Sequence, residues 1–182
     1  MKYLFFDIEC ANCDDRRGKI YSFGYIVVDE NLNVVENEKD IIMNPNVEQW
    51  RWYVLKNILA YSKKDVESRS KFDKHYNKIK RLLEDKDTKV CGFSVKDDVG
   101  YLLDECERYR LEPIKIDFFD IQRLEAKISE SHNKGLEESY LFWCRQLPIG
   151  VHRSDIDARF TLEIAREICK KQKKTQIGRA HV

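Results

Sequence analysis

The segment KYLFFDIE, residues 2–9, constrains the fold most. It is a short apolar run, with apolar residues on both faces of a strand, and two acids stand at its end. On a strand, Tyr3 and Phe5 share one face with these acids, and the intervening residues form the other face. Two apolar faces are typical of the central strand of a covered sheet. We expect Asp7 and Glu9 to project together from its end and to repel each other unless a cation bridges them. A strand that runs out into a polar loop would give the same pattern.

A second acid lies on the apolar side of a predicted helix in the segment GFSVKDDVGYLLDECERYR. Placed at 100° per residue, Asp98 shares a face with Val95 and Leu102. Its neighbour Asp97 falls on the polar side. An acid on an apolar stripe is protonated, paired or bound to a metal ion. Metal binding fits best if the two strand acids lie nearby.

The segment VHRSDIDARFT separates two acids in the same way. Asp157 falls on the apolar face of the predicted helix, whereas Asp155 falls on the polar face with Arg159. His152 precedes this helix, within reach of whatever Asp157 binds. Two alternatives stay open. Ser154 and Asp157 match an N-terminal capping arrangement, and a single histidine before a helix is usually incidental.

The three segments together resemble the histidine subclass of the DEDD 3′ to 5′ exonucleases, a superfamily with a ribonuclease-H-like fold. The residues that carry the resemblance are Asp7 and Glu9 in FDIE, Asp98 in DVGYL, and His152 and Asp157 in HRSDIDARFT. Their order and spacing agree with the family, and the resemblance spans roughly residues 1 to 170. The combined motif is far more specific than any of its parts.

The resemblance implies a metal-dependent enzyme that releases nucleoside 5′-monophosphates from free 3′ ends. Four carboxylates roughly match the charge of two Mg²⁺ or Mn²⁺ ions, which oxygen ligands favour over zinc. The expected metal ligands are Asp7, Glu9, Asp98 and Asp157. His152, neutral near pH 7, is the expected general base, which takes a proton from the attacking water.

Some positions depart from the common pattern of the family. Ile8 and Cys10 stand where threonine is frequent, and Asp97 belongs to an altered segment around Asp98. The choice between DNA and RNA therefore stays open. The expected partners are single-stranded or frayed 3′ ends of either nucleic acid, with a polymerase or another protein as a further possibility. A catalytically silent nucleic-acid-binding module and an exonuclease subunit of a polymerase assembly are the alternatives.

The remaining pattern predicts an α/β, ribonuclease-H-like fold. We expect a mixed five-stranded sheet, with three antiparallel strands and two parallel ones, flanked by helices. The expected strands after the first are 19–28, 33–43, KVCGF and IKIDFF. A right-handed crossover through the Asp98 helix makes the last two parallel. The expected helical segments are 50–85, 120–130, 135–145 and 154–173.

Composition suits one soluble domain, which we expect to span residues 1–174. The chain has 182 residues, of which 42% are hydrophobic and 36% charged, and its net charge is +1. This charge argues against a strongly basic nucleic-acid scaffold. The sequence has no signal-peptide pattern and no membrane-spanning run, so we expect a cytoplasmic protein without a membrane partner. Residues 177–182, IGRAHV, match a translated sequencing adapter, and we expect them to be an artefact of an incomplete gene.

Two smaller features have competing explanations. Cys10 and Cys13 form an isolated CxxC without evident further zinc ligands, and a redox role competes with coincidence. Without an export signal, we expect the six cysteines to be reduced. Trp50, Trp52 and Tyr53 could stack on substrate bases or pack within the helical region.

Overall fold

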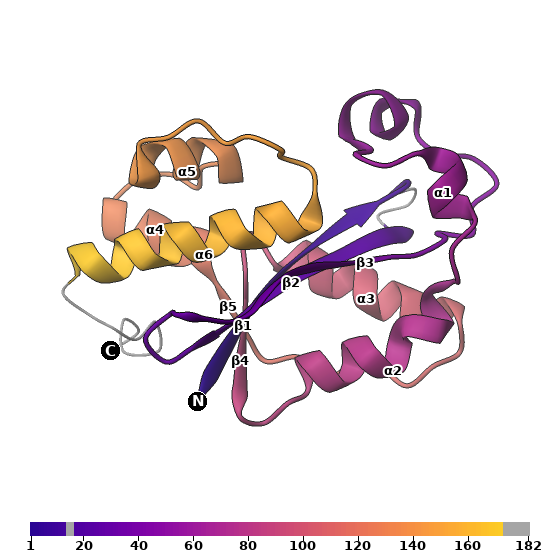
Figure 1. The fold of residues 1–182 in the computed structure, drawn as a ribbon, viewed down its shortest axis with the longest axis horizontal. Coiled ribbons are helices and arrows are strands. Elements are labelled where there is room, and N and C mark those ends of the chain that lie inside the picture. Colours follow the sequence, from indigo (N-terminus) through magenta and orange to yellow (C-terminus); the bar gives the residue numbers. More distant parts are fainter. Residues whose placement is uncertain (14–16, 173–182) are drawn as a thin grey trace.

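The computed structural model describes residues 1–13 and 17–172, and it contains a mixed five-stranded sheet with helices on both faces (Figure 1). The strands are β1 (Lys2–Cys10), β2 (Ile20–Asp29), β3 (Val34–Ile42), β4 (Thr88–Gly92) and β5 (Phe118–Asp120). Their order is β3-β2-β1-β4-β5, so β1 is central. The first three strands pair antiparallel, and β4 and β5 extend the sheet in parallel. The predicted fold class and strand arrangement are confirmed.

The helices are α1 (Lys63–Glu67), α2 (Phe72–Leu83), α3 (Lys96–Arg108), α4 (Ile121–Ser129), α5 (Leu136–Cys144) and α6 (Ser154–Lys171), with a short π-helical turn η2 (Val54–Ile58). All helices except α1 form two layers, one on each side of the sheet (Figure 1). Tyr3 and Phe5 of β1 pack in a core with α4, α5 and α6. Leu4 and Phe6 pack in a second core with α2 and α3. Both faces of β1 are therefore buried, as its sequence predicts.

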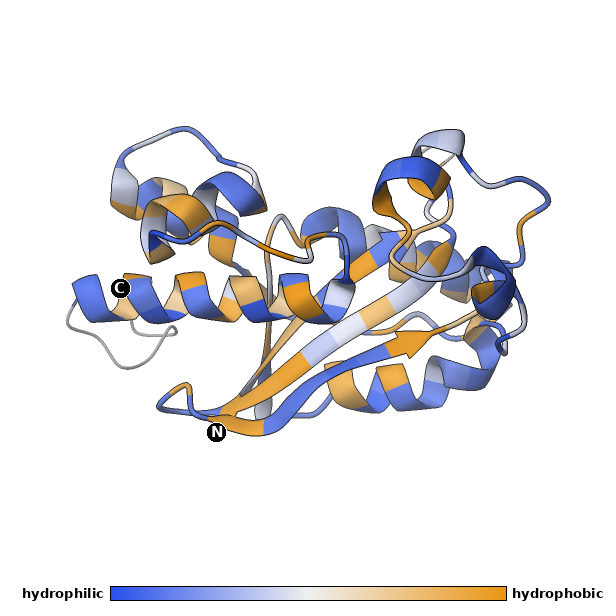
Figure 2. Ribbon diagram, turned by 45° about the horizontal axis from the view of Figure 1, so that its top comes forward, coloured by the Kyte–Doolittle hydropathy of each residue, from blue (hydrophilic) through white to orange (hydrophobic). Residues whose placement is uncertain are grey.

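The covering helices are amphipathic, and Figure 2 shows hydrophobic and hydrophilic residues alternating along α6. In α2 the buried residues recur at helical spacing, at Phe72, Tyr76, Ile79 and Leu83. Such a stripe is expected of a helix that lies with one face on a sheet. Among the described residues, no helix has both the length and the apolar content needed to cross a membrane.

Gly24 allows the start of α6 to lie directly on the sheet. A Cβ atom at this position would lie 2.0 Å from the backbone nitrogen of Asp155 and 2.0 Å from the carbonyl carbon of Ser154. Gly24 of β2 also pairs with Asp7 of β1. The missing side chain therefore brings the first turn of α6 close to the strand that carries Asp7.

Two predicted elements differ from the structure. The strand predicted at IKIDFF is wrong over its first four residues, because the Lys115 N–H donates to Glu84 Oε1 at 2.8 Å instead of extending the ladder with β4. The helical region predicted at 50–85 is broken into η2, α1 and α2. Leu59 is extended after η2, and the Ser62 hydroxyl caps α1. The predicted helix end at 173, the domain boundary at 174 and the segment 177–182 lie outside the described residues.

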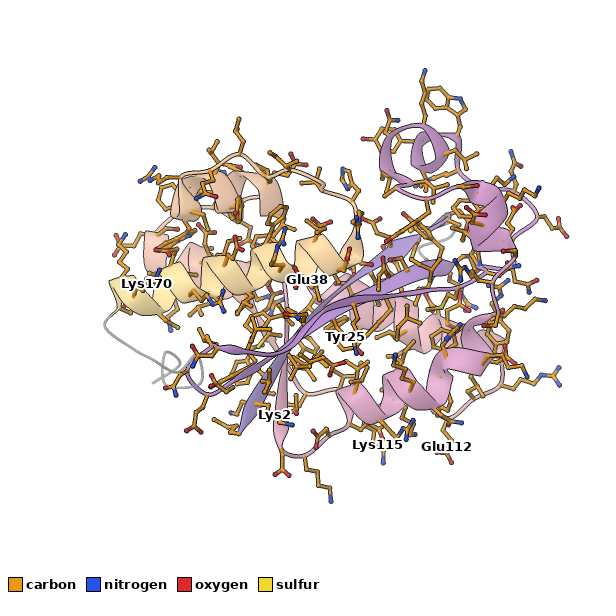
Figure 3. All side chains as sticks on the ribbon, viewed as in Figure 1. Lys2, Tyr25, Glu38, Glu112, Lys115 and Lys170 are labelled. Atoms are coloured by element: carbon orange, nitrogen blue, oxygen red, sulfur yellow. The ribbon has the colours of Figure 1, made fainter. Side chains whose placement is uncertain are left out.

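The predicted exposure of Asp155 is also wrong. Only 7% of Asp155 is exposed, and Arg153 pairs with its carboxylate at 2.8 Å. Further along α6, Arg159 pairs at 2.9 Å with Glu38, which lies beside the helix (Figure 3). The polar side of α6 faces the edge strand β3 rather than open water, so its charged residues form contacts with the sheet.

We predict that Gly24→Ala destabilises the protein by roughly 1 to 3 kcal/mol or more, because the new methyl group overlaps the backbone of α6. Urea unfolding measures this change. Gly100→Ala is the matched control, since a Cβ at Gly100 in α3 meets no heavy atom within 4 Å. That variant should gain up to about 1 kcal/mol from helix propensity. Equal stability of the two variants would contradict the proposed close packing.

Candidate functional site

The five residues singled out from the sequence come from three places that meet at one end of β1. Asp7 and Glu9 lie on the second half of this strand and are half-buried. Asp98 lies in the first turn of α3 and is 8% exposed, and Asp157 lies in the first turn of α6 and is 4% exposed. His152 lies just before α6. The structure brings all five into one electrostatic cluster.

Asp7 is surrounded by the other acids. Burial raises the pKa of Asp7 well above its usual value. The carboxylates of Asp98 and Asp157 raise the pKa of Asp7 further, followed by those of Glu9 and Asp40. Desolvation and like charges both penalise the ionised form, so this group needs either a proton or a cation nearby.

Asp98 faces the cluster and Asp97 faces solvent, as the helical pattern predicts. Burial raises the pKa of Asp98 well above its usual value, and Glu9, Asp97 and Asp120 add to the effect. Asp120 is held by its own hydrogen bonds, because its Oδ1 accepts from the N–H groups of Ser94 and Gln122 at 3.1 and 3.0 Å. This residue ends β5 and fixes the loop that leads into α3.

Asp157 has one oxygen in a hydrogen bond and one without. Its Oδ2 accepts from the His152 N–H at 2.9 Å, while its buried Oδ1 has no hydrogen-bond partner among the described residues. Burial raises the pKa of Asp157 to about 7, and the Glu9 charge contributes. An unpaired buried oxygen on a carboxylate fits a cation ligand.

The capping arrangement expected as an alternative is not formed. Arg153 is the residue that precedes the helix, and no side chain caps it. The Ser154 hydroxyl instead contacts Ser22 and donates to Asp40. The acid half of the motif is absent too, because Asp157 accepts from the backbone N–H of His152 and not from that of Arg153. Capping therefore does not account for the unpaired oxygen of Asp157.

His152 is held against Glu9 by an unusual backbone conformation. Its φ is 65°, in the left-handed region, and its Nδ1 lies 3.7 Å from Glu9 Oε1. At this distance the contact is an ion pair rather than a hydrogen bond. The Glu9 carboxylate raises the pKa of His152 above its usual value, so without a cation the ring is protonated more readily than the sequence suggests. Ligand atoms of Glu9, His152 and Asp157 lie within 4.8 Å of one another.

Asp40 of β3 is a residue of this region that the sequence does not single out. Its Oδ1 accepts from the Ser22 hydroxyl at 2.7 Å, and its Oδ2 accepts from the Tyr61 hydroxyl. Burial raises the pKa of Asp40, and its charge acts on Asp7. In the sequence this acid is one of several charges in ENEKD, and only the pairing of β3 with β2 shows that it faces the site.

The two cysteines of the CxxC segment, Cys10 and Cys13, are both reduced thiols. None of the six cysteines, all of which lie within the described residues, forms a disulfide. Burial raises the pKa of Cys10 well above its usual value, and the contact with Cys13 adds to this effect. Thiol exchange requires a thiolate, so the raised pKa of Cys10 disfavours a redox role for this residue.

The sequence of the chain matches the model of one known protein family. A family model described as Exonuclease matches residues 4–165, which is most of the chain. No curated protein matches the chain. The matched segment includes every residue of the candidate site.

Solved structures of exonucleases share this fold. A 3′-exonuclease in a structure of histone mRNA stem-loop recognition has a TM-score of 0.78 and 14% identity, over 93% of this chain and 64% of that one. The nuclease domain of 3′hExo, a DEDDh family member bound to rAMP, has a TM-score of 0.75 and 14% identity, over 93% and 91%. Zinc-bound E. coli exonuclease I with single-stranded DNA has a TM-score of 0.75 and 16% identity, over 96% and 41%. The chain thus spans under two thirds of the first relative and about two fifths of the last.

We predict that ionisation of Asp157 destabilises the protein when no cation is bound. Its pKa is about 7 in the folded state against a usual value of 3.8. Because the folded-state pKa is raised, the stabilising effect of the protonated form is present at low pH and is lost as the pH rises from about 4 to about 7. Relative to Asp157→Asn, the wild type should lose on the order of 2 to 4 kcal/mol of unfolding free energy over this range.

Urea unfolding in EDTA at both ends of this pH range measures the difference between the two proteins. Addition of Mg²⁺ at the higher pH should stabilise the wild type more than Asp157→Asn. A difference in unfolding free energy that does not change with pH would contradict the assignment of a raised pKa to Asp157.

Proposed function

Because the chain belongs to the exonuclease family, we propose that it hydrolyses phosphodiester bonds at the 3′ ends of nucleic acids and releases nucleoside 5′-monophosphates. The observation that carries this proposal is the convergence of four carboxylates and one histidine at the end of β1. Three separate elements supply these carboxylates, and two of them are almost fully buried. Structural packing alone does not favour such a concentration of like charge.

The donor set fits divalent cations. Asp157 has a buried oxygen without a partner among the described residues, and burial and like charges raise the pKa values of Asp7 and Asp98. We propose two Mg²⁺ or Mn²⁺ ions, because hard oxygen ligands favour these ions. The residues that would hold them are Asp7, Glu9, Asp98 and Asp157. Bound ions of this kind lower the pKa of water and neutralise charge that develops on phosphate oxygens.

His152 is the proposed general base. Its side chain is 39% exposed, which gives water and substrate access to the ring. Its Nδ1 faces Glu9, so Nε2 is the nitrogen that would accept a proton from the attacking water. The bond between the His152 N–H and Asp157 Oδ2 holds the backbone from which this ring projects. Glu9 therefore orients the ring, and Asp157 orients its backbone.

The substrate class is a 3′ end of single-stranded or frayed DNA or RNA. The relatives described above include proteins bound to single-stranded DNA, to rAMP and to an mRNA stem-loop, so the shared fold accommodates both sugars. Selectivity depends on how the site treats the 2′-hydroxyl. A polymerase or another protein partner and a cytoplasmic location stay predictions.

We predict that Asp98→Asn reduces hydrolysis by at least about a hundredfold, because it removes a carboxylate from the cation site. Asp97→Asn is the matched control: it makes the same chemical change one residue away on the solvent side of α3 and should retain most activity. The assay uses single-stranded DNA and RNA oligomers labelled at either end, with Mg²⁺, Mn²⁺ or EDTA. Gel electrophoresis then reports both the direction and the metal dependence of degradation.

The wild type should shorten substrates stepwise from the 3′ end, and EDTA should stop the reaction. Degradation from the 5′ end would contradict the proposed polarity. A wild type that binds these oligomers but cleaves none with either metal would support a silent binding module instead.

We predict that His152→Ala lowers kcat by roughly a hundredfold or more, because it removes the general base. Affinity for oligomers should change much less, which a binding measurement checks. Added imidazole should restore part of the activity, since the ring that it replaces is partly open to solvent. Full activity of His152→Ala would show that another group accepts the proton.

A further inference from the structure

An aromatic surface is exposed where the turn η2 begins. Trp52 and Tyr53, which precede the turn, are 67% and 58% exposed, and Leu55 within the turn is 38% exposed. Single exposed apolar residues are common on protein surfaces, but here two aromatic rings and a leucine lie within four consecutive residues. We call residues 50–61, which contain them, the aromatic lobe. These rings contribute little to the core, so the fold does not account for them.

The aromatic lobe has a rigid base. Trp50 is only 4% exposed, and its ring centroid lies 5.4 Å from that of Tyr21. Its Nε1 donates to Glu67 Oε1 at 2.9 Å. Val54 and Val66 pack in the same small core. Trp50 is therefore structural, whereas Trp52 and Tyr53 project from a fixed support.

One end of the aromatic lobe is attached just beyond Glu9. The Arg51 N–H donates to the Ala11 carbonyl at 3.0 Å, and the Asn12 side chain donates to the Gln49 carbonyl at 3.0 Å. Ala11 is two residues past Glu9, and Trp52 is one residue past Arg51. By chain geometry the Cα atoms of Trp52 and Glu9 lie no more than roughly 18 Å apart.

The other end is attached beside His152. The Tyr61 hydroxyl donates to Asp40, which also accepts from the Ser154 hydroxyl. The Arg153 guanidinium lies 5.9 Å from the centre of the Tyr61 ring. Arg153 directly follows His152 in the chain. The aromatic lobe thus forms a rim that connects the two sides of the candidate site.

The positive charge of the aromatic lobe complements the negative charge of a nucleic-acid backbone. The aromatic lobe, residues 50–61, contains two cations and no acid. These cations are Arg51 and Lys56. The Lys56 ammonium lies 4.7 Å from the centre of the Trp52 ring. Aromatic faces interleaved with cations are the usual means of gripping single strands, because every base has a stacking face and every nucleotide a phosphate.

From these observations we infer that Trp52 and Tyr53 form a stacking surface for unpaired bases of the substrate strand, on the 5′ side of the terminal nucleotide. This inference rests on the proposed exonuclease function and adds a binding site to it. The bases are bound without sequence preference, and Lys56 and Arg51 contact the adjacent phosphates. Unpaired bases are the favoured occupant because the surface is both aromatic and cationic and lies next to the site of hydrolysis.

The test compares normal oligomers with abasic ones. Fluorescence anisotropy measures binding of labelled DNA and RNA oligomers of about 12 nucleotides, each with a hydrolysis-resistant 3′-terminal linkage. A matched set keeps the terminal nucleotide but lacks the internal bases. The variants are Trp52→Ala with Tyr53→Ala, and Trp52→Phe alone. Val35→Ala is the control, because Val35 is 58% exposed at the opposite end of the sheet.

The double alanine variant should weaken binding of base-bearing oligomers about tenfold or more. Its affinity for abasic oligomers should equal that of the wild type, because these oligomers have no internal bases that could stack on Trp52 and Tyr53 in either protein. Trp52→Phe should retain most of the affinity, and Val35→Ala all of it. Binding of DNA and RNA by the wild type shows which sugar the adjacent site accepts.

Equal weakening on normal and abasic oligomers would overturn the inference, because the lobe would then act through phosphates or through the fold. Unchanged affinity on both would also overturn it and would leave the exposed rings to a protein partner. Failure of the wild type to cleave hydrolysable oligomers would instead refute the proposed enzymatic function. The dependence of binding on bases is measured separately from cleavage, so the two failures are distinguishable.

Discussion

The rest of the structure depends on the concentration of negative charge at the end of β1. Asp7 and Glu9 leave the central strand where α3 and α6 begin, and these helices add Asp98 and Asp157. Burial and mutual repulsion raise the pKa values of the three aspartates, so the ionised cluster opposes folding unless cations balance it. The same electrostatic cost that makes this end of the sheet unfavourable is the reason why we propose that it binds divalent ions.

Close packing holds these charges together. Gly24 lets the backbone of α6 lie on β2, and the Asp40 hydrogen bonds with Ser22 and Ser154 connect that helix to the sheet edge. The cores on both faces of β1 fix the strand itself. The aromatic lobe is attached to the same framework through Ala11 and Asp40, so the proposed stacking surface is anchored next to the carboxylate cluster.

The sequence predicts well what depends on local periodicity. The two apolar faces of β1 and the opposite orientations of Asp97 and Asp98 follow from strand and helix periods, and the structure confirms both. The predicted exposure of Asp155 is wrong because helical periodicity separates the polar face of α6 from its apolar face but does not show that β3 lies against the polar face. Asp40 could not be found, because its role comes from strand pairing between distant residues. Periodicity alone does not show that the acids of three distant segments and His152 belong to one site. That expectation comes from the resemblance to the exonucleases.

The most direct test of the central claim is anomalous diffraction from crystals of the protein grown with Mn²⁺. The account predicts two Mn²⁺ peaks roughly 3.5 to 4 Å apart among the carboxylates of β1, α3 and α6. One of them should contact the Asp157 oxygen that lacks a hydrogen-bond partner among the described residues. Well-ordered carboxylates without any Mn²⁺ peak between them, in crystals saturated with the ion, would contradict the claim that cations balance this charge.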